Sequence, residues 1–325
     1  MTKEDLRIVF MGTPEFAVET LKALVENNYQ VVAVVTQPDK PVGRHGSVLQ
    51  PSAVKQYSME HGLPVLQPEK MKDPAFIEQL RSYQANLQVV VAFRMLPEVV
   101  WGMPEYGTFN VHAALLPQYR GAAPINWAVI NGETETGVTT FFLDHDIDTG
   151  RIIMQLPFPI PDDADVEYVY DGLMHLGARI CLQTLERIID TDGHPATSLQ
   201  EECSTFAPKI FKETCEIDWA QPAKKVYDFV RGLSPYPGAW TTLMSPDGKK
   251  TVLKIFKTLK TGQKASKAGD IVVDGKHVYI TTADEKLELL ELQLEGKKRM
   301  QAADFLNGMR EKLKDEIIFQ SKYNK

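Results

Sequence analysis

Cysteine is scarce in this chain of 325 residues, and its spacing excludes two classes of protein. The three cysteines are Cys181, Cys203 and Cys215, and no two of them form a Cys-x-x-Cys pair. A disulfide-stapled fold needs several paired cysteines, and a structural zinc site needs closely spaced ligands. Scattered cysteines are typical of reduced thiols, so we expect a cytoplasmic protein.

Long apolar runs are also absent. No run approaches the roughly 20 apolar residues that a membrane-spanning helix requires. The first residues, Met1 to Asp5, show no basic stretch followed by an apolar one, so we expect no secretory signal. A hydrophobic content of 43% and a charged content of 24% are typical of a soluble globular protein. We therefore expect no membrane partner.

Familiar signatures of a covalent catalyst, a dinucleotide site and a metal site are absent or weak as well. No Ser or Cys occupies a nucleophile elbow, which argues against a covalent acyl-enzyme. Gly12 is not part of a Gly-x-Gly-x-x-Gly fingerprint, so a dinucleotide site is only weakly supported. A metal site built from His112, Asp144, His145 and Asp148 stays open, but no paired-histidine spacing supports it.

The net charge of −7 conceals an uneven distribution along the chain. Residues 1–206 carry 14 Lys and Arg against 27 Asp and Glu, a net charge of −13. Residues 207–325 carry 22 against 16, a net charge of +6. A basic final part is expected of a segment that contacts a polyanion, although a lysine-rich solvated face explains the charge about equally well.

The length of the chain exceeds that of an ordinary single domain, so two domains are expected. In the first part, apolar runs at 6–11, 29–35 and 87–93 predict buried strands, and the apolar spacing at 16–27 predicts a helix. Strand–helix–strand units of this kind predict a parallel sheet with right-handed crossovers. Residues 37–51 form a long polar loop, for which a surface excursion and a ligand clamp are about equally well supported.

The last part of the chain has a different pattern. Residues 190–206 are polar with little periodicity, which predicts a linker. Short alternating strands follow, separated by turns such as Asp274-Gly275-Lys276, and this pattern predicts a small β-barrel. The strands are expected near 239–244, 252–258, 269–273, 277–282 and 288–294.

The stretch 109–150 concentrates polar side chains between predicted strands. Asn110 and His112 are two residues apart, so they share a face at the carboxyl end of a strand, where open α/β sheets place their sites. An amide can donate to a developing oxyanion, an imidazole can transfer a proton, and the carboxylate of Asp148 can orient that imidazole. Spacing alone leaves structural alternatives open: His112 as a buried core histidine and Asp148 as the cap of the following turn.

The motifs of this stretch resemble a known signature. Asn110-x-His112, Leu115-Leu116-Pro117-x-Tyr119-Arg120-Gly121-Ala122-Ala123-Pro124 and Asp148-Thr149-Gly150 look like the signature of the 10-formyltetrahydrofolate-dependent formyltransferase family. Other segments resemble the branch of that family that acts on methionyl-tRNA. They are residues 10–17, 38–44, 50–52, 207–210, 217–219 and 296–300.

This resemblance implies a doubly wound, Rossmann-like N-terminal domain that holds the folate, and a C-terminal β-barrel, similar to an OB-fold, that binds tRNA. It implies a catalytic domain at 1–189, a linker at 190–206 and a tRNA-binding domain at 207–325. The implied reaction moves the formyl group of 10-formyltetrahydrofolate to the α-amino group of methionyl-initiator tRNA. We expect no metal, and we take a monomer as the working expectation.

The resemblance also assigns site residues. The implied catalytic trio is Asn110, His112 and Asp148. The implied folate pocket is lined by Phe93, Arg94, Met95, Leu96, Leu115, Leu116, Pro117, Asp144, His145 and Asp146. The implied tRNA contacts are Lys40, Arg44, Lys209, Lys297 and Lys298.

Three positions depart from the family pattern. Ala114 stands where Ser is common, and Arg94 and Asp146 stand where Gly is common. We expect Arg94 either to pair with Asp146 or to meet the glutamate tail of the folate. An amino sugar, a nucleotide amine or water remain alternative acceptors of the formyl group. A non-enzymatic nucleic-acid-binding protein is the other class, against which the acidic first part and the complete trio argue.

Overall fold

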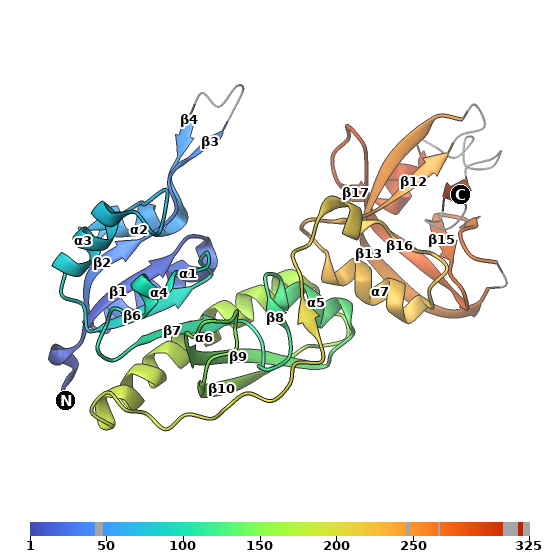
Figure 1. The fold of residues 1–325 in the computed structure, drawn as a ribbon. Helices are drawn as coiled ribbons and strands as arrows, with labels where there is room; N and C mark the ends of the chain where they lie inside the picture. The colour runs from blue at the N-terminus through green and yellow to red at the C-terminus, as the bar shows by residue number, and fades with distance from the viewer. Residues whose placement is uncertain (43–47, 245–247, 266, 308–317, 321–325) are drawn as a thin grey trace. The chain divides into compact units, whose positions relative to one another are not determined.

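The computed structural model describes residues 1–42, 48–244, 248–265, 267–307 and 318–320, and these form two compact units (Figure 1). The first unit comprises Met1–Pro124, Glu135–Pro159 and Tyr170–Ala207. The second comprises Ile125–Thr134, Ile160–Val169 and Pro208–Lys325. The domain boundaries predicted from the sequence, with a linker at 190–206, remain a proposal.

A seven-stranded sheet organises the first unit. Its spatial order is β10-β9-β7-β6-β1-β2-β5. The strands from β7 to β5 are parallel, whereas β9 and β10 extend the sheet with antiparallel pairing. The Rossmann-like fold predicted for this part is confirmed. The strands are β1 (Arg7–Gly12), β2 (Gln30–Val35), β5 (Val65–Leu66), β6 (Leu87–Val91), β7 (Thr108–His112), β9 (Glu135–Phe142) and β10 (Ile152–Pro159).

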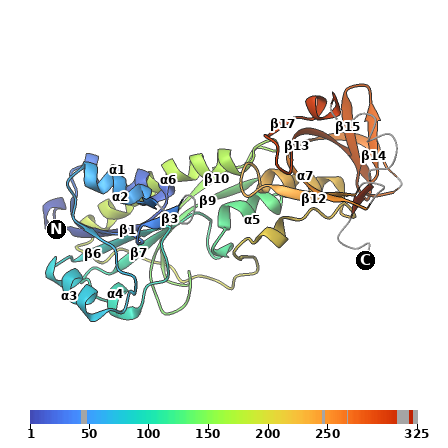
Figure 2. The same ribbon diagram turned by 90° about the horizontal axis from the view of Figure 1, so that it is seen from above.

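Helices cover both faces of this sheet, α1, α2 and α6 on one face and α3 and α4 on the other (Figure 2). Every residue of β6 is buried, as expected of a parallel strand covered on both sides. Among the described residues, no helix combines the length and apolar character needed to cross a bilayer. The helices are α1 (Glu15–Glu26), α2 (Ala53–Glu60), α3 (Pro74–Ser82), α4 (Glu98–Trp101) and α6 (Val166–Asp190), preceded by a short 3₁₀ helix at Lys3–Asp5.

Two of these helices begin beside side chains that cap them. The hydroxyl of Ser52 accepts a hydrogen bond from the backbone N–H of Lys55, which caps α2. The carboxylate of Asp73 accepts one from the backbone N–H of Ala75, and Pro74 occupies the first position of α3. Both caps satisfy N–H groups that the helix itself cannot bond.

The order of the strands reverses at β1, which lies between β2 and β6. Open α/β sheets bind ligands at the carboxyl ends of strands beside such a reversal. β1 ends at Gly12, β6 at Val91 and β7 at His112, so these ends meet on one side of the sheet. Asn110 and His112 lie at such an end, and the predicted folate residues 93–96 and 115–117 follow the ends of β6 and β7 in the chain. Residues 144–148 instead follow β9, which is antiparallel to β7.

A hairpin replaces part of the loop predicted at 37–51. β3 (Lys40–Val42) pairs antiparallel with β4 (Val48–Gln50), and residues 43–47 between them lie outside the described residues. These strands are exposed, so no buried alternation marks them in the sequence. The sequence pattern also fails to predict α5 (Pro124–Ile130) and the two-residue strands β8 (Arg120–Gly121) and β11 (Phe206–Ala207).

The second unit is built on antiparallel strands, as predicted. Their path is β14-β15-β16-β13-β12-β18, and β17 pairs with β16. All pairings in it are antiparallel. The elements are the 3₁₀ helix Lys212–Cys215, α7 (Ala223–Gly232), β12 (Ala239–Met244), β13 (Lys250–Lys264), β14 (Ile271–Asp274), β15 (His277–Thr281), β16 (Glu285–Leu294), β17 (Met300–Gln301) and β18 (Ile318–Gln320).

The core of the second unit joins α7 to this curved sheet. Trp219 is fully buried there, and its indole N–H donates to the hydroxyl of Thr241 at 3.0 Å. The register of β13 against β16 shifts at three places, and such bulges bend and twist a strand. Among the described residues, the strand pairings form an open path rather than a closed ring, which is compatible with the partly open barrel of an OB-fold.

Candidate active site

Asn110 and His112 lie at the carboxyl end of β7, on the same face of the strand. His112 is buried with 6% of its surface exposed, and its ring packs edge-on to Phe141 with 6.4 Å between the ring centroids. The amide oxygen of Asn110 is buried and has no hydrogen-bond partner among the described residues. A buried polar atom without a partner costs about 1–3 kcal/mol, so the strand holds a group that a ligand could satisfy.

The two ring nitrogens of His112 have different environments. Nε2 lies 3.0 Å from the backbone carbonyl oxygen of Tyr119. Because a carbonyl oxygen only accepts, Nε2 carries a proton and donates it. Nδ1 lies 3.9 Å from Oδ2 of Asp148, within ion-pair reach but beyond hydrogen-bond distance. Nδ1 is therefore the ring nitrogen available to exchange a proton, and the carboxylate faces it.

Asp148 is held in a turn that presents its carboxylate. Its φ is +56°, a left-handed conformation that Asp and Asn tolerate better than most residues. Oδ2 accepts a hydrogen bond from the backbone N–H of Gly121 at 2.9 Å, and the side chain is 12% exposed. The structure thus brings His112 and Asp148 together, as predicted, in a site that excludes most solvent.

The groups that hold this pair are not among the site residues predicted from the sequence. Gln200 donates to the carbonyl oxygens of Asp148 and Gly150, and Tyr119 donates through its backbone N–H to the carbonyl of Thr205. Gly121 has a φ of +127°, and a Cβ there would lie 2.5 Å from the carbonyl oxygen of Ala207. Tyr119 and Gly121 belong to the family motif, but nothing in the local sequence around Gln200 signals its role.

A single threonine anchors the Leu-Leu-Pro segment that follows β7. The Thr139 hydroxyl on β9 donates to the carbonyl of Ala114 at 2.6 Å and accepts from the backbone N–H of Leu116 at 3.1 Å. The side-chain amide of Gln155 reaches both the same hydroxyl and the carbonyl of Leu116. Thr139 is fully buried, so these bonds fix the segment in the absence of water.

We expect Thr139→Val to lower the free energy of unfolding of the first unit by about 1–3 kcal/mol. Valine has nearly the same shape as threonine, but it leaves the buried carbonyl of Ala114 and the buried N–H of Leu116 without their hydrogen-bond partner. Denaturant titration followed by circular dichroism measures it. Thr242→Val on β12 is the control, since that residue is half-exposed. An equal effect of both substitutions would show that the hydrogen bonds of Thr139 contribute nothing particular.

One of the two expectations for Arg94, a pairing with Asp146, is wrong. Its guanidinium donates to the carbonyl oxygens of Pro68 and Glu69, while its Nε is buried without a partner among the described residues. Burial lowers the pKa of the guanidinium from its ordinary value. The guanidinium also lies 5.7 Å from the ring centroid of Phe93. Arg94 therefore ties the end of β6 to the segment that follows β5.

The other predicted folate residues divide by exposure. Leu96 and Leu116 are buried, whereas Met95 is 70% exposed and available to a ligand. Phe93, Leu115 and Pro117 are half-buried, and Asp144, His145 and Asp146 are exposed. Within the described residues, no group of three or more His, Cys, Asp or Glu is arranged to hold a metal ion.

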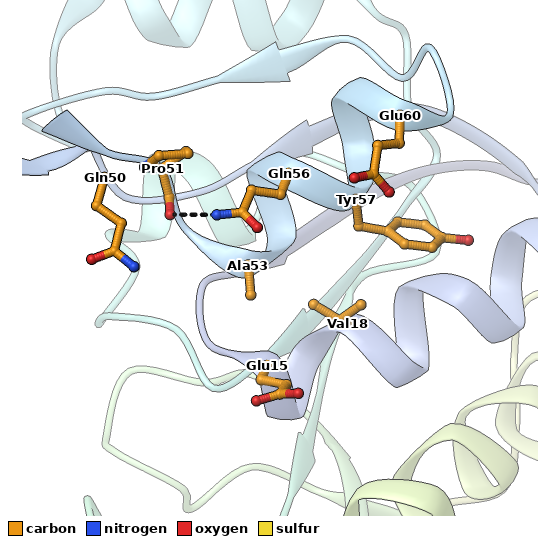
Figure 3. A pocket seen from close by; sticks show the side chains of 8 residues that line it. All are labelled: Glu15, Val18, Gln50, Pro51, Ala53, Gln56, Tyr57 and Glu60. Carbon is orange, nitrogen blue, oxygen red and sulfur yellow. Dashed lines mark hydrogen bonds between the residues drawn. The ribbon is translucent and has the colours of Figure 1, made fainter.

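A cavity of about 440 Å³ lies elsewhere in the first unit, between α1 and α2 (Figure 3). Glu15 and Glu60 contribute carboxylates to it, and the amide of Gln56 donates to the carbonyl of Pro51 beside it. None of the predicted site residues lines this cavity. Its two carboxylates disfavour a phosphate there.

The predicted tRNA contacts lie on exposed segments of both units. Lys40 is exposed on β3, whereas Arg44 falls outside the described residues. Lys209 is exposed, and its Nζ lies 5.4 Å from the ring centroid of Phe211, which is itself 57% exposed. Lys297 and Lys298 are exposed in the turn between β16 and β17. The described lysines are thus accessible to a large anionic partner.

The sequence of this chain is similar to those of known proteins. Residues 6–185 match the family described as Formyl transferase, and residues 209–310 match that described as Formyl transferase, C-terminal domain. A protein of Parabacteroides distasonis named methionyl-tRNA formyltransferase is 62% identical over 317 residues, which cover 96% of this chain and 98% of the relative. A protein of Bacteroides fragilis with the same name is 58% identical over 315 residues, 95% of this chain and 96% of the relative.

A solved structure shares the fold. HypX from Aquifex aeolicus in complex with tetrahydrofolic acid superposes with a TM-score of 0.62 at 20% sequence identity. The match covers 93% of this chain and 47% of that chain. At this identity the likeness concerns the fold alone.

Proposed function

The chain belongs to the formyl transferase family, and we propose that it moves the formyl group of 10-formyltetrahydrofolate to the α-amino group of methionyl-initiator tRNA. The observation that carries the proposal is the 62% identity to a methionyl-tRNA formyltransferase over 96% of the chain, because it includes the second unit. The product, formylmethionyl-tRNA, serves translation initiation. The arrangement of Asn110, His112 and Asp148 supports the reaction.

The residues at the ends of β6 and β7 fit a folate co-substrate. Asn110 offers a buried amide oxygen that has no partner among the described residues. Met95 offers an exposed apolar side chain in the loop that follows β6. Binding sites of this kind combine apolar walls with a few fixed polar groups. When bound, 10-formyltetrahydrofolate supplies the formyl carbon. Phe93 to Leu96, Leu115 to Pro117 and Asp144 to Asp146 would surround it.

The side-chain N–H of Asn110 and the protonated Nδ1 of His112 would stabilise the formyl oxygen while the amine attacks. Negative charge develops on that oxygen, and one preorganised donor at such a position is worth about 10²–10³-fold in rate. The backbone fixes both side chains on one face of β7, so neither has to be ordered during the reaction. The protein thereby supplies orientation together with charge stabilisation.

His112 and Asp148 would move the proton that the attacking amine loses to N10 of the folate. The bond between N10 and the formyl carbon would then break, and tetrahydrofolate would leave. Nε2 of His112 is committed to the carbonyl of Tyr119, so exchange takes place at Nδ1, 3.9 Å from the carboxylate of Asp148. Hydrogen bonds at active sites often shorten when the substrate binds. A positioned proton-transfer group is worth about 10²–10⁴-fold in rate.

The second unit and the β3–β4 hairpin would hold the tRNA. Arg44 and Lys40 would act near the aminoacyl end, and Lys209, Lys297 and Lys298 would contact phosphates, in line with the net charge of +6 of residues 207–325. We also keep the catalytic domain at 1–189, the linker at 190–206 and a monomeric enzyme as parts of this proposal.

We expect Lys297→Ala to raise KM for tRNA and to reduce the slope of log KM against log salt by about 1, because each phosphate contact releases a counterion. Initial rates between 50 and 200 mM salt measure the slope. Lys264→Ala is the control, since this exposed lysine faces Glu285 at the other end of β16. If both variants change the slope equally, net charge rather than a contact at Lys297 explains tRNA binding.

Other acceptors define the alternatives. An amino sugar, a nucleotide amine and water would all use the same trio. Of these acceptors, only tRNA is a polyanion that would match the net charge of +6 of residues 207–325. The test offers 10-formyltetrahydrofolate with methionyl-tRNA, a nucleotide-linked amino sugar, glycinamide ribonucleotide or no acceptor, and follows formyl transfer. We expect methionyl-tRNA to be formylated at least 100-fold faster than the others, a difference of roughly 2.7 kcal/mol in activation free energy. A faster reaction with any other acceptor would overturn the proposal.

A further inference from the structure

One side chain in the segment that precedes β11 is bonded to two parts of the active site. The Nε2 group of Gln200 donates to the carbonyl oxygen of Asp148 at 2.9 Å and to that of Gly150 at 2.7 Å. Its Oε1 accepts from Nε of Arg120 at 3.0 Å and from Nη2 of the same residue at 2.7 Å. A side-chain amide has two N–H donors and room for two acceptor bonds, so every one is used here.

Three consecutive residues of the loop after β7 complete this arrangement. The carbonyl of Tyr119 accepts from His112, the guanidinium of Arg120 donates to Gln200, and the N–H of Gly121 donates to the carboxylate of Asp148. Gln200 joins the second of these residues to the backbone of Asp148. The hydrogen bonds therefore connect the loop at 119–121 to both His112 and Asp148.

The turn at Asp148 needs such support. Its left-handed φ of +56° costs roughly 1–2 kcal/mol for a residue with a side chain, and such a conformation persists only where the surroundings fix it. The preceding residues, 144–147, are exposed. The two bonds from Gln200 to the carbonyls on either side of Thr149 hold the backbone from which the carboxylate projects.

We propose that Gln200 is a positioning residue for formyl transfer, which sets the distance and direction of the Asp148 carboxylate relative to Nδ1 of His112. It acts through Asp148 and touches no reacting atom. The inference rests on the proposed function, because it assigns the residue to that reaction. It also makes part of the predicted linker a component of the catalytic apparatus.

Gln200→Ala and Gln200→Glu test the role by kinetics. Gln200→Ala should lower kcat roughly 10- to 100-fold, since displacements of about 1 Å have effects of this size, while KM for both substrates changes less than about threefold. Gln200→Glu should be at least as impaired, because its carboxylate can still accept from Arg120 but faces two carbonyl oxygens with no proton to donate. Loss through KM alone, or an unchanged kcat, would overturn the inference.

Thr197→Ala is the matched control in the same segment. The Thr197 hydroxyl also accepts from an arginine, Nε of Arg151 at 2.7 Å, but it has no bond to Asp148 or to the loop at 119–121. We expect this variant to keep the kcat of the unmodified protein. A similar kcat loss in Thr197→Ala would indicate that any loosening of the segment suffices and would overturn the specific role of Gln200.

A double-substitution cycle separates positioning from general stability. If Gln200 acts through Asp148, Gln200→Ala should change single-turnover rates by less than about twofold once Asp148→Asn is present. The same fold loss in both backgrounds would overturn the inference. Methionyl-tRNA formylation by the unmodified protein and by Thr197→Ala is the check on the proposed function itself. Its absence would count against that function, whereas normal turnover there leaves the cycle to decide on Gln200.

Discussion

His112→Ala is expected to lower kcat for methionyl-tRNA formylation by about 10²–10⁴-fold, with little change in KM. The substitution removes Nδ1, the ring nitrogen at which we place proton exchange and which, when protonated, would also donate to the formyl oxygen. Single-turnover formylation with saturating 10-formyltetrahydrofolate measures the chemical step directly. The effect should be the largest of any single substitution considered for this chain, because two contributions are lost at once.

Folding has to be separated from chemistry in this variant. His112 is buried and bonded to the carbonyl of Tyr119, so its removal also leaves that carbonyl without its donor, at a cost of about 1–3 kcal/mol. Circular dichroism and thermal unfolding report this loss. His175→Ala is the control on the same unit, since that histidine is exposed and paired with Glu19. Turnover by His112→Ala within about threefold of the control would contradict the assigned role.

Asp148→Asn is expected to lower kcat by about 10²-fold or more while the fold is kept. Asn tolerates the left-handed φ of +56°, and its amide oxygen can still accept from the N–H of Gly121. The negative charge that faces Nδ1 of His112 is lost, so the imidazole is no longer held in its charged form during proton transfer.

Asp148→Ala provides the comparison for the backbone. Alanine lacks both the charge and the side-chain acceptor and is disfavoured at positive φ, so this variant should lose thermal stability that Asp148→Asn retains. A kcat for Asp148→Asn within about threefold of the unmodified protein would show that the carboxylate merely shapes the turn. Loss of activity only in Asp148→Ala would lead to the same conclusion.

The sequence predicts the parallel sheet and the end of β7 well, because both depend on local patterns. Continuous apolar runs mark β1 and β6, and the two-residue spacing of Asn110 and His112 places them on one face at the carboxyl end of a strand. In the second unit, turns such as Asp274-Gly275 separate the strands, and the strands form close to the positions that the sequence predicts. Apolar runs and apolar alternation indicate which side chains are buried, and the burial of these side chains stabilises the strands.

The support of the site is set by tertiary contacts that leave no local signal. Gln200 lies about 50 residues beyond Asp148 and 80 beyond Arg120, and its segment shows neither periodicity nor a motif. The β3–β4 hairpin is missed for another reason, since its short strands are exposed and carry no buried alternation. Arg94 could not be placed either, because its partners are backbone carbonyls of Pro68 and Glu69, which any sequence offers.

The most direct test of the account is formylation of charged initiator tRNA beside charged elongator methionyl-tRNA, with 10-formyltetrahydrofolate as the donor. The purified chain should form formylmethionyl-tRNA on the initiator, with a kcat/KM at least 100-fold above that on the elongator, and Asp148→Asn should lose this activity. Absence of formyl transfer to the initiator tRNA, or transfer that persists in Asp148→Asn, would contradict the account.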